Sequence, residues 1–569
     1  MPAQDPPYSA AEPEKMKIGL AINGGMLVAA AGGAAIMRGF QQKTIIIDGE
    51  ERPAMEAFDC VSGLSGGNIT VMLYAYAQNA NSNELLDAEH CIDGPSQITP
   101  KVLNRNPHKS IFQRLTKSIV AKLGPLLAYE KCIGKNMKGA WPVALWQDFL
   151  QPYGIKRNQP FGTSSENEVV SPREEVKAEP LMNFAMLGEV QDNGNEFTEC
   201  EKKMKTKLDK LIPKPGTYVA EKSIMLDVEG GFFTPSQISE VMEKVNNISR
   251  VSFTVSPSDV GTGHSLTMIA DSGELQPATK LTKPSEWGES NNHFSLELAL
   301  AMGTWPVPKN QQQQLYQFGN VEKNMIFGDG GIVTPLVDIH SLVRRNVRKI
   351  IIPMWGYSPG HNYIEIYKIT KNLSLSIWAS QMSMTWISSY FGFYAGTANY
   401  QMSQIFDEGE MHLQKLRESF DDLFLAGKPL VTTLKDVKVI DNPFYGVVGG
   451  GTVDLTIMYV TMPRLFGESV PRESVPPREG FDKTVDESGY FTNLEMKDFP
   501  NFDAMNAKNN SFSGNKIEWI KGALETGIMT TRQTNMMACL GSWLIDEAWE
   551  GVSIDGKEYF GGFKEILQA

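Results

Sequence analysis

The stretch FDCVSGLSGGNITVMLYAYA, residues 58–77, combines a strand-like run, a glycine-rich turn and a helix-like run. FDCVSG is typical of a short buried strand, and NITVMLYAYA, which is apolar almost all round, is typical of a buried helix. Between them, Ser65 stands among Gly63, Gly66 and Gly67. Such a strand–turn–helix unit either needs small residues for its geometry alone or presents one hydroxyl group to a reaction site.

The G-x-S-x-G pattern occurs twice, at 63–67 and at 356–360, so the pattern alone does not identify a nucleophile. A nucleophilic serine on such a turn needs a backbone N–H after it to bind an oxyanion. Gly66 supplies that N–H, whereas Ser358 is followed by Pro359, which has none. GHSLT at 263–267 lacks the second glycine. Ser65 is therefore the candidate nucleophile, and a purely structural glycine turn is the alternative.

Two further segments carry candidate site residues. MKIGLAI at 16–22 is a strand-like run that passes abruptly into Asn-Gly-Gly, and MIFGDGG at 325–331 ends a second one. None of the seven histidines follows a strand in this way, so Asp329 is the preferred base for Ser65 over a Ser–His–Asp triad. A simple turn aspartate is the alternative for Asp329.

These blocks in this order resemble the patatin and cytosolic group IV phospholipase A2 superfamily. The resemblance implies an α/β patatin-like three-layer fold, with a mixed central sheet flanked by helices and a large cap insertion. It implies a Ser65–Asp329 dyad, with the backbone N–H groups of Gly24 and Gly25 as oxyanion donors. Leu27 falls where the cytosolic phospholipases have an arginine, so Arg38, Arg344 or Arg345 is needed if a phosphate is bound.

Composition limits the alternatives. A net charge of −13 argues against bulk binding to nucleic acid, and five scattered cysteines without a CxxC pair favour a reducing, cytoplasmic location over a disulfide framework or zinc site. Catalysis is expected to need no metal or other cofactor. Residues 18–37 are uncharged, but five glycines and six alanines make a membrane span improbable.

Residues 1–15 are expected to form a loose tail, and 16–569 one catalytic domain with a cap insertion at roughly 85–320. Within it, residues 101–122 carry six basic and no acidic residues, with Ile111, Leu115 and Ile119 spaced four apart. This spacing fits a helix that lies on an anionic lipid surface, or equally a charged face of the cap.

The sequence therefore predicts a serine hydrolase of lipid acyl esters, similar to phospholipase A2 or lysophospholipase, with a lipid substrate and peripheral membrane contact. A transacylase with the same dyad and a catalytically silent lipid-binding scaffold are the alternatives.

Overall fold

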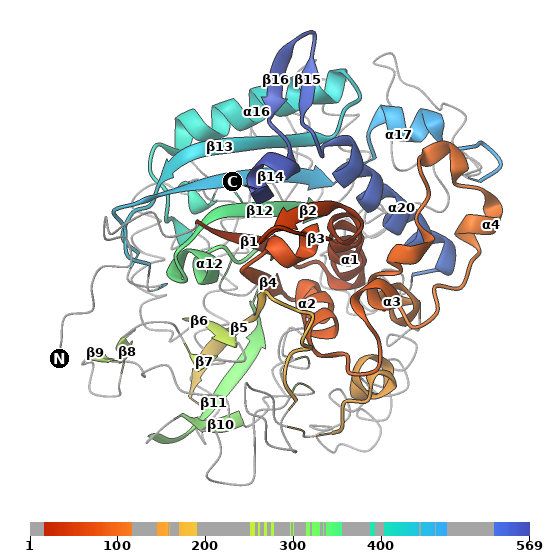
Figure 1. Ribbon diagram of the computed structural model, residues 1–569. Helices are drawn as coiled ribbons and strands as arrows, with labels where there is room; N and C mark the ends of the chain where they lie inside the picture. The colour runs from red at the N-terminus through yellow and green to blue at the C-terminus, as the bar shows by residue number, and fades with distance from the viewer. Residues whose placement is uncertain are drawn as a thin grey trace, which may run out of the picture.

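The computed structural model describes residues 16–116, 145–157, 159, 170–189, 251–255, 260–261, 267–269, 275–277, 296, 300, 315–318, 321–330, 334, 337–355, 387, 389–392, 403–442, 445, 447–460, 462–474 and 529–568. The helices and strands within these ranges are arranged around one mixed β-sheet (Figure 1). The predicted tail at 1–15 lies outside the described residues.

Six strands form the centre of the sheet. Their order is β5 (Glu179–Glu189), β4 (Cys60–Leu64), β1 (Lys17–Ile22), β12 (Val347–Trp355), β14 (Thr452–Val460) and β13 (Leu430–Lys438). The first five run parallel and β13 runs antiparallel to β14. β4 is buried along its whole length, as continuous apolar runs in parallel sheets usually are. The expected mixed sheet flanked by helices is confirmed at this level.

Helices cover both faces of β1, and small residues bring them close. Gly33 of α1 (Met26–Gln42) contacts Ile22, where an added Cβ would lie 2.5 Å from Ile22 Cγ2. On the other face, a Cβ on Gly19 would lie 3.1 Å from Leu342 Cδ2 in α12 (His340–Arg344). Residues 19 and 22 of a strand point to opposite faces, so α1 and α12 flank the sheet.

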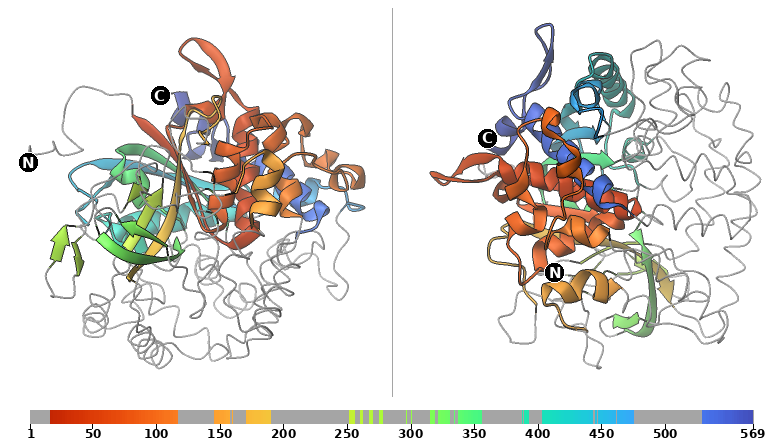
Figure 2. Two further views of the ribbon diagram at one scale, coloured as in Figure 1. Left: turned by 90° about the horizontal axis from the view of Figure 1, so that it is seen from below. Right: turned by 90° about the vertical axis from the view of Figure 1, so that its right-hand side faces the viewer.

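Helix α20 (Thr531–Glu547) lies along α1, although the two are far apart in the sequence. Figures 1 and 2 show the blue α20 beside the red α1. Gly541 of α20 faces Ala35 of α1, and Gly39 of α1 faces Ile545 of α20. These glycines let the two backbones approach more closely than larger side chains would allow.

The other described elements are mostly short. Three pairs of strands form separate two-stranded sheets among the described residues: β2 (Thr44–Ile47) with β3 (Glu50–Pro53), β8 (Thr267–Ile269) with β9 (Leu275–Pro277), and β15 (Val552–Ile554) with β16 (Lys557–Phe560). The helices are α2 (Gly66–Tyr76), α3 (Ser82–Leu86), α4 (Pro100–Leu103), α5 (Ile111–Leu115), α16 (Gly409–Leu425), α17 (Arg464–Ser469) and α21 (Phe563–Gln568). Single turns occur at Ala54–Ala57, Ala88–His90, Pro95–Gln97, Trp146–Leu150 and Gln151–Tyr153.

Strand β5 continues beyond the end of β4 and pairs there with β11 (Val321–Asp329), which also pairs with β10 (Leu315–Phe318). The opposite side of β5 is taken by β6 (Val251–Val255), which pairs with residues 182–186 and with β7 (Val260–Gly261). A strand has two sides, so β4 and β11 share the same side of β5. β4 ends there opposite Asn183 and β11 ends opposite Phe184, so the two strands meet end to end.

The range predicted as a cap insertion therefore contains part of the central sheet, because β5 lies within it. Its basic segment also differs from the interfacial helix considered above. Ile111 and Leu115 of α5 are fully buried in the core, so these two side chains are not available to a lipid surface. Lys109 pairs with Glu84 at 3.0 Å. Ile119 lies outside the described residues.

Residues 18–37, considered above as a possible membrane span, form β1 and the first part of α1. Across the described ranges, none of the helices has the length and apolar character needed to cross a membrane.

Candidate active site

Ser65 occupies a strained turn between β4 and α2. Its backbone has φ 50° and ψ −119°, and it precedes the first residue of α2. A residue with a Cβ avoids this region, and holding one there costs about 1–3 kcal/mol. The strand, the strained serine and the helix are the three features expected of a nucleophile turn. The Ser65 side chain is largely buried, with the residue 7% exposed.

The glycines around Ser65 are needed for close approach of backbones. A Cβ on Gly63 would lie 2.8 Å from the carbonyl carbon of Gly67. A Cβ on Gly67 would lie 2.7 Å from the carbonyl oxygen of Ile22 and 2.9 Å from that of Asn23. The glycines of the G-x-S-x-G pattern thus allow the turn to be tight and to pack against the end of β1.

The Asn-Gly-Gly segment follows β1 beside this turn. β1 pairs in parallel with β4, with Ile22 opposite Gly63, so Gly24 and Gly25 leave the sheet at the same edge as Ser65. Gly25 precedes α1 with φ 134°, a conformation that favours glycine. The first N–H groups of a helix have no partner within it and carry partial positive charge. Helices α1 and α2 both begin at this edge, so the local field favours negative charge there.

The end-to-end meeting of β4 and β11 brings the backbone of Asp329 to the serine turn. Gly330, which follows Asp329, lies against Leu64, which precedes Ser65. A Cβ on Gly330 would lie 2.2 Å from Leu64 Cδ1 and 3.0 Å from the carbonyl oxygen of Asn183. Glycine at this position therefore lets the two strand ends meet. The side chain of Asp329 lies outside the described part of the structure.

Arg344 and Arg345 precede β12, at the opposite edge of the sheet. Arg345 Nε donates to Glu179 Oε2 at 3.2 Å, and Glu179 lies opposite Cys60 at the start of β4. Arg344 Nη1 donates to the Tyr445 carbonyl at 2.9 Å. Ser65 follows the other end of β4, so the positions of these arginines do not support a role in substrate binding.

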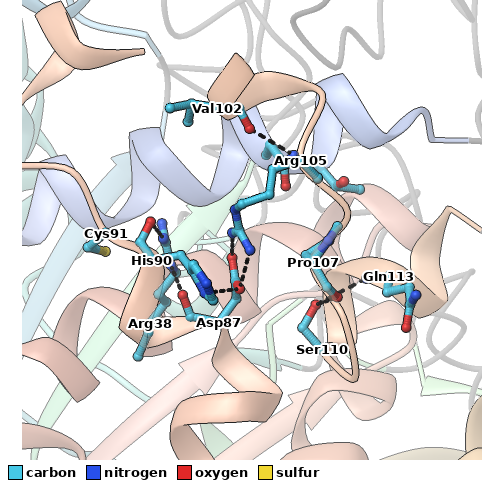
Figure 3. A network of polar contacts seen from close by, with 12 residues as sticks. Arg38, Asp87, His90, Cys91, Val102, Arg105, Pro107, Ser110 and Gln113 are labelled. Carbon is cyan, nitrogen blue, oxygen red and sulfur yellow. Dashed lines mark hydrogen bonds and ion pairs between the residues drawn. The ribbon is translucent and has the colours of Figure 1, made fainter. Parts of the chain in front are cut away.

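Arg38, the third candidate cation, belongs to a buried polar network (Figure 3). Its guanidinium group donates to the carbonyl oxygens of Asp87 at 3.1 Å and His90 at 2.9 Å, and to Ser542 Oγ at 3.3 Å. The Asp87 carboxylate also pairs with Arg105. Arg38 is 1% exposed, so it joins α1 to the segment after α3 and to α20. Leu27, in the first turn of α1, is buried as well.

Asp338 and His340 form a buried pair beside Ser62 of β4. His340 Nδ1 is 3.7 Å from Asp338 Oδ1, and the ring stacks on Tyr445 with centroids 3.6 Å apart. Burial lowers the pKa of His340, although Asp338 opposes this effect. Burial raises the pKa of Asp338, but hydrogen bonding and charge from His340 and Arg344 outweigh it, so the Asp338 pKa is lowered overall. The His340 ring centroid also lies 4.8 Å from that of Tyr390, and Nε2 lies 3.2 Å from the Ser403 carbonyl oxygen. His340 thus has the contacts of a packed core residue.

Three polar residues that the sequence patterns did not indicate surround the serine turn. Ser62, Asn68 and Asn183 are at most 1% exposed, and Asn183 is hydrogen-bonded to both of the others. The only signal in the sequence was a polar residue within or at the start of an apolar run, which is too common to indicate a site. No protein-family model matches the chain, and neither does any curated protein. Within the described ranges, no three His, Cys, Asp or Glu side chains are grouped as a metal site would require.

Proposed function

We propose that this protein is a serine acyl hydrolase that cleaves acyl esters of lipids with a Ser65–Asp329 dyad. The observation that carries the proposal is the strained Ser65 turn at the start of α2, against which the strand of Asp329 ends. The adjacent Asn-Gly-Gly segment supports it, because glycine N–H groups at a helix start suit an oxyanion. The lipid substrate rests on the resemblance to the patatin and cytosolic phospholipase superfamily.

In the proposed reaction, Ser65 Oγ attacks the ester carbonyl carbon while Asp329 takes its proton. The Gly24 and Gly25 N–H groups stabilise the negative oxygen of the tetrahedral intermediate. Asp329 then returns the proton to the leaving alcohol, which gives an acyl-Ser65 ester. Water attacks that ester with Asp329 again as the base, and the carboxylic acid is released. An alcohol or lysolipid in place of water would make the same site a transacylase.

Substrate preference follows from the residue at position 27. Leu27 cannot pair with a phosphate, and Arg38 is engaged in the core. We therefore favour uncharged acyl esters over phospholipids. Incubation with a mixed lipid extract, followed by mass spectrometry of the products, distinguishes free fatty acids from transferred acyl chains and identifies the lipid class consumed.

Labelling with a fluorophosphonate probe tests the proposal directly. The wild-type protein should be labelled at Ser65, and Ser65→Ala should not be labelled. Ser65→Ala and Asp329→Asn should each reduce ester hydrolysis by about 1,000-fold or more, with the double variant little worse than either. Ser358→Ala serves as the matched control and should retain activity. Absence of labelling in the wild-type protein would favour the non-catalytic lipid-binding alternative.

A further inference from the structure

We propose that Asn68 and Asn183 form a positioning pair that fixes the serine turn to the strand end that carries Asp329. This inference rests on the proposed hydrolase function, because it concerns the geometry of that dyad. Neither asparagine is assigned a chemical step. Their role is to set the separation between Ser65 and Asp329.

The two asparagines bind each other through four groups. Asn68 Nδ2 donates to the carbonyl oxygen of Asn183 at 3.0 Å, and the Asn183 N–H donates to Asn68 Oδ1 at 3.2 Å. The side chain of Asn68 therefore satisfies both backbone groups of Asn183, as a neighbouring strand would. Both residues have no exposed surface. Without these bonds, each buried backbone group would cost about 1–3 kcal/mol.

The location of this pair gives it its proposed role. Asn183 lies opposite Leu64, the last residue of β4, while Phe184, next along β5, lies opposite Asp329. The carboxamide of Asn68 thus forms hydrogen bonds with the backbone of β5 at the junction where β4 and β11 meet end to end. Asn68 is in the first turn of α2, and its N–H donates to the carbonyl oxygen of Ser65 at 3.0 Å. One residue thus contacts the nucleophile's backbone and the strand that positions Asp329.

The side chain of Asn183 extends the connection to the chain beyond Asp329. Asn183 Nδ2 donates to Ser62 Oγ and to the Gly63 carbonyl, both at 2.8 Å. Ser62 Oγ lies 3.2 Å from the Asp338 carbonyl, to which it can donate, and 3.2 Å from Ser341 Oγ. The segment that leaves β11 is therefore tied to β4 three residues before Ser65. Apolar side chains could fill the same space, but they would not fix the relative orientation of these segments as paired hydrogen-bond donors and acceptors do.

A double-mutant cycle separates positioning from general stabilisation. Asn68→Ala should lower kcat about 10–100-fold with little change in KM, because a displacement near 1 Å is enough for such a loss. In the Asp329→Asn background, the same change should cost less than about twofold, since there is no base left to position. If Asn68 had a purely structural role, the fold-losses in kcat of the two single variants would multiply in the double variant, and that result would overturn the inference.

The matched control is Asn535→Ala. Asn535 in α20 is also a buried amide, and its Nδ2 donates to the carbonyl oxygens of Val102, Leu103 and Arg105. Its loss should lower stability and leave kcat of the folded protein unchanged. If Asn68→Ala does not fold, Ser62→Ala provides a milder test. It removes one hydroxyl and should lower kcat several-fold, again only when Asp329 is present.

Hydrogen exchange tests the same anchoring without an activity measurement. In Asn68→Ala, amides at the end of β11, around Gly328 and Asp329, should exchange at least tenfold faster, while amides of α20 should not change. Unchanged exchange at β11 would refute the positioning role. If the wild-type protein fails to react with a fluorophosphonate, the hydrolase proposal fails, and hydrogen exchange still decides whether Asn68 anchors β11.

Discussion

Replacing Gly67 with alanine should weaken the oxyanion site while retaining both residues of the proposed dyad. The new Cβ would lie 2.7 Å from the Ile22 carbonyl oxygen and 2.9 Å from that of Asn23. Restoring an ordinary contact of 3.4 Å requires the two backbones to separate by about 0.7 Å, at a cost of about 1–3 kcal/mol. Complete loss of one oxyanion donor costs about 100–1,000-fold in kcat. Since the displacement weakens the Gly24 and Gly25 donors without removing them, we expect kcat to fall about 10–100-fold.

Hydrolysis of a soluble short-chain ester gives kcat and KM, and thermal unfolding gives the stability of the same samples. Gly541→Ala is the matched control, because its Cβ would lie 2.5 Å from Ala35 Cβ, a comparable clash in α20. Ala35 is about 15 Å along α1 from Gly25. That variant should lose stability and retain kcat. A Gly67→Ala protein with kcat within twofold of wild type, or an equal loss in Gly541→Ala, would refute the assignment of the oxyanion site.

Three further predictions concern stability. Arg38→Met should lower the free energy of unfolding by about 3 kcal/mol or more in urea denaturation, because it removes the donors to the buried Asp87 carbonyl oxygen and the part-buried His90 carbonyl oxygen. A loss below about 1 kcal/mol would contradict this. Burial raises the pKa of Cys60 to about 12 and that of Cys539 to about 11. As the pH rises, the thiols ionise in the unfolded protein before they ionise in the folded protein, so the free energy of unfolding should decline above about pH 9. Cys60→Ala should flatten that decline, and identical pH profiles for the variant and the wild type would refute this prediction. Leu115→Ser should destabilise the fold by about 2–4 kcal/mol, and weaker vesicle binding at unchanged stability would instead favour the interfacial helix.

The fold near the serine was predictable because local patterns agree with the final structure. The apolar run that ends at Ile22, the glycines around Ser65 and the apolar helix after them each specify one element. β5 was not recognised as part of the sheet. Its apolar run Leu181–Leu187 is interrupted by Asn183 and lies within a polar region. Asn183, which we propose anchors the serine turn, therefore also made the strand harder to recognise from the sequence.

The location of a residue relative to the two edges of the sheet was harder to predict than which segments form strands and helices. Arg344 and Arg345 precede β12, which places them at the amino edge of the parallel strands, whereas the serine turn follows the carboxyl edge of β4. Strand direction alone would have placed them at the edge away from Ser65 once the sheet was known to be parallel. The spacing of Ile111 and Leu115 indicated an apolar helix face, but periodicity does not specify whether that face meets lipid or protein.

Because β4 and β11 share one side of β5, β5 serves as a common template for both halves of the proposed dyad. Their separation depends on strand register and not on the length of chain between them. Closing a longer loop costs only about 0.6 kcal/mol for each doubling of its length. Stretches of sequence between β5 and β11 that lie outside the paired strands can therefore change in length in evolution while the spacing between Ser65 and the end of β11 is preserved.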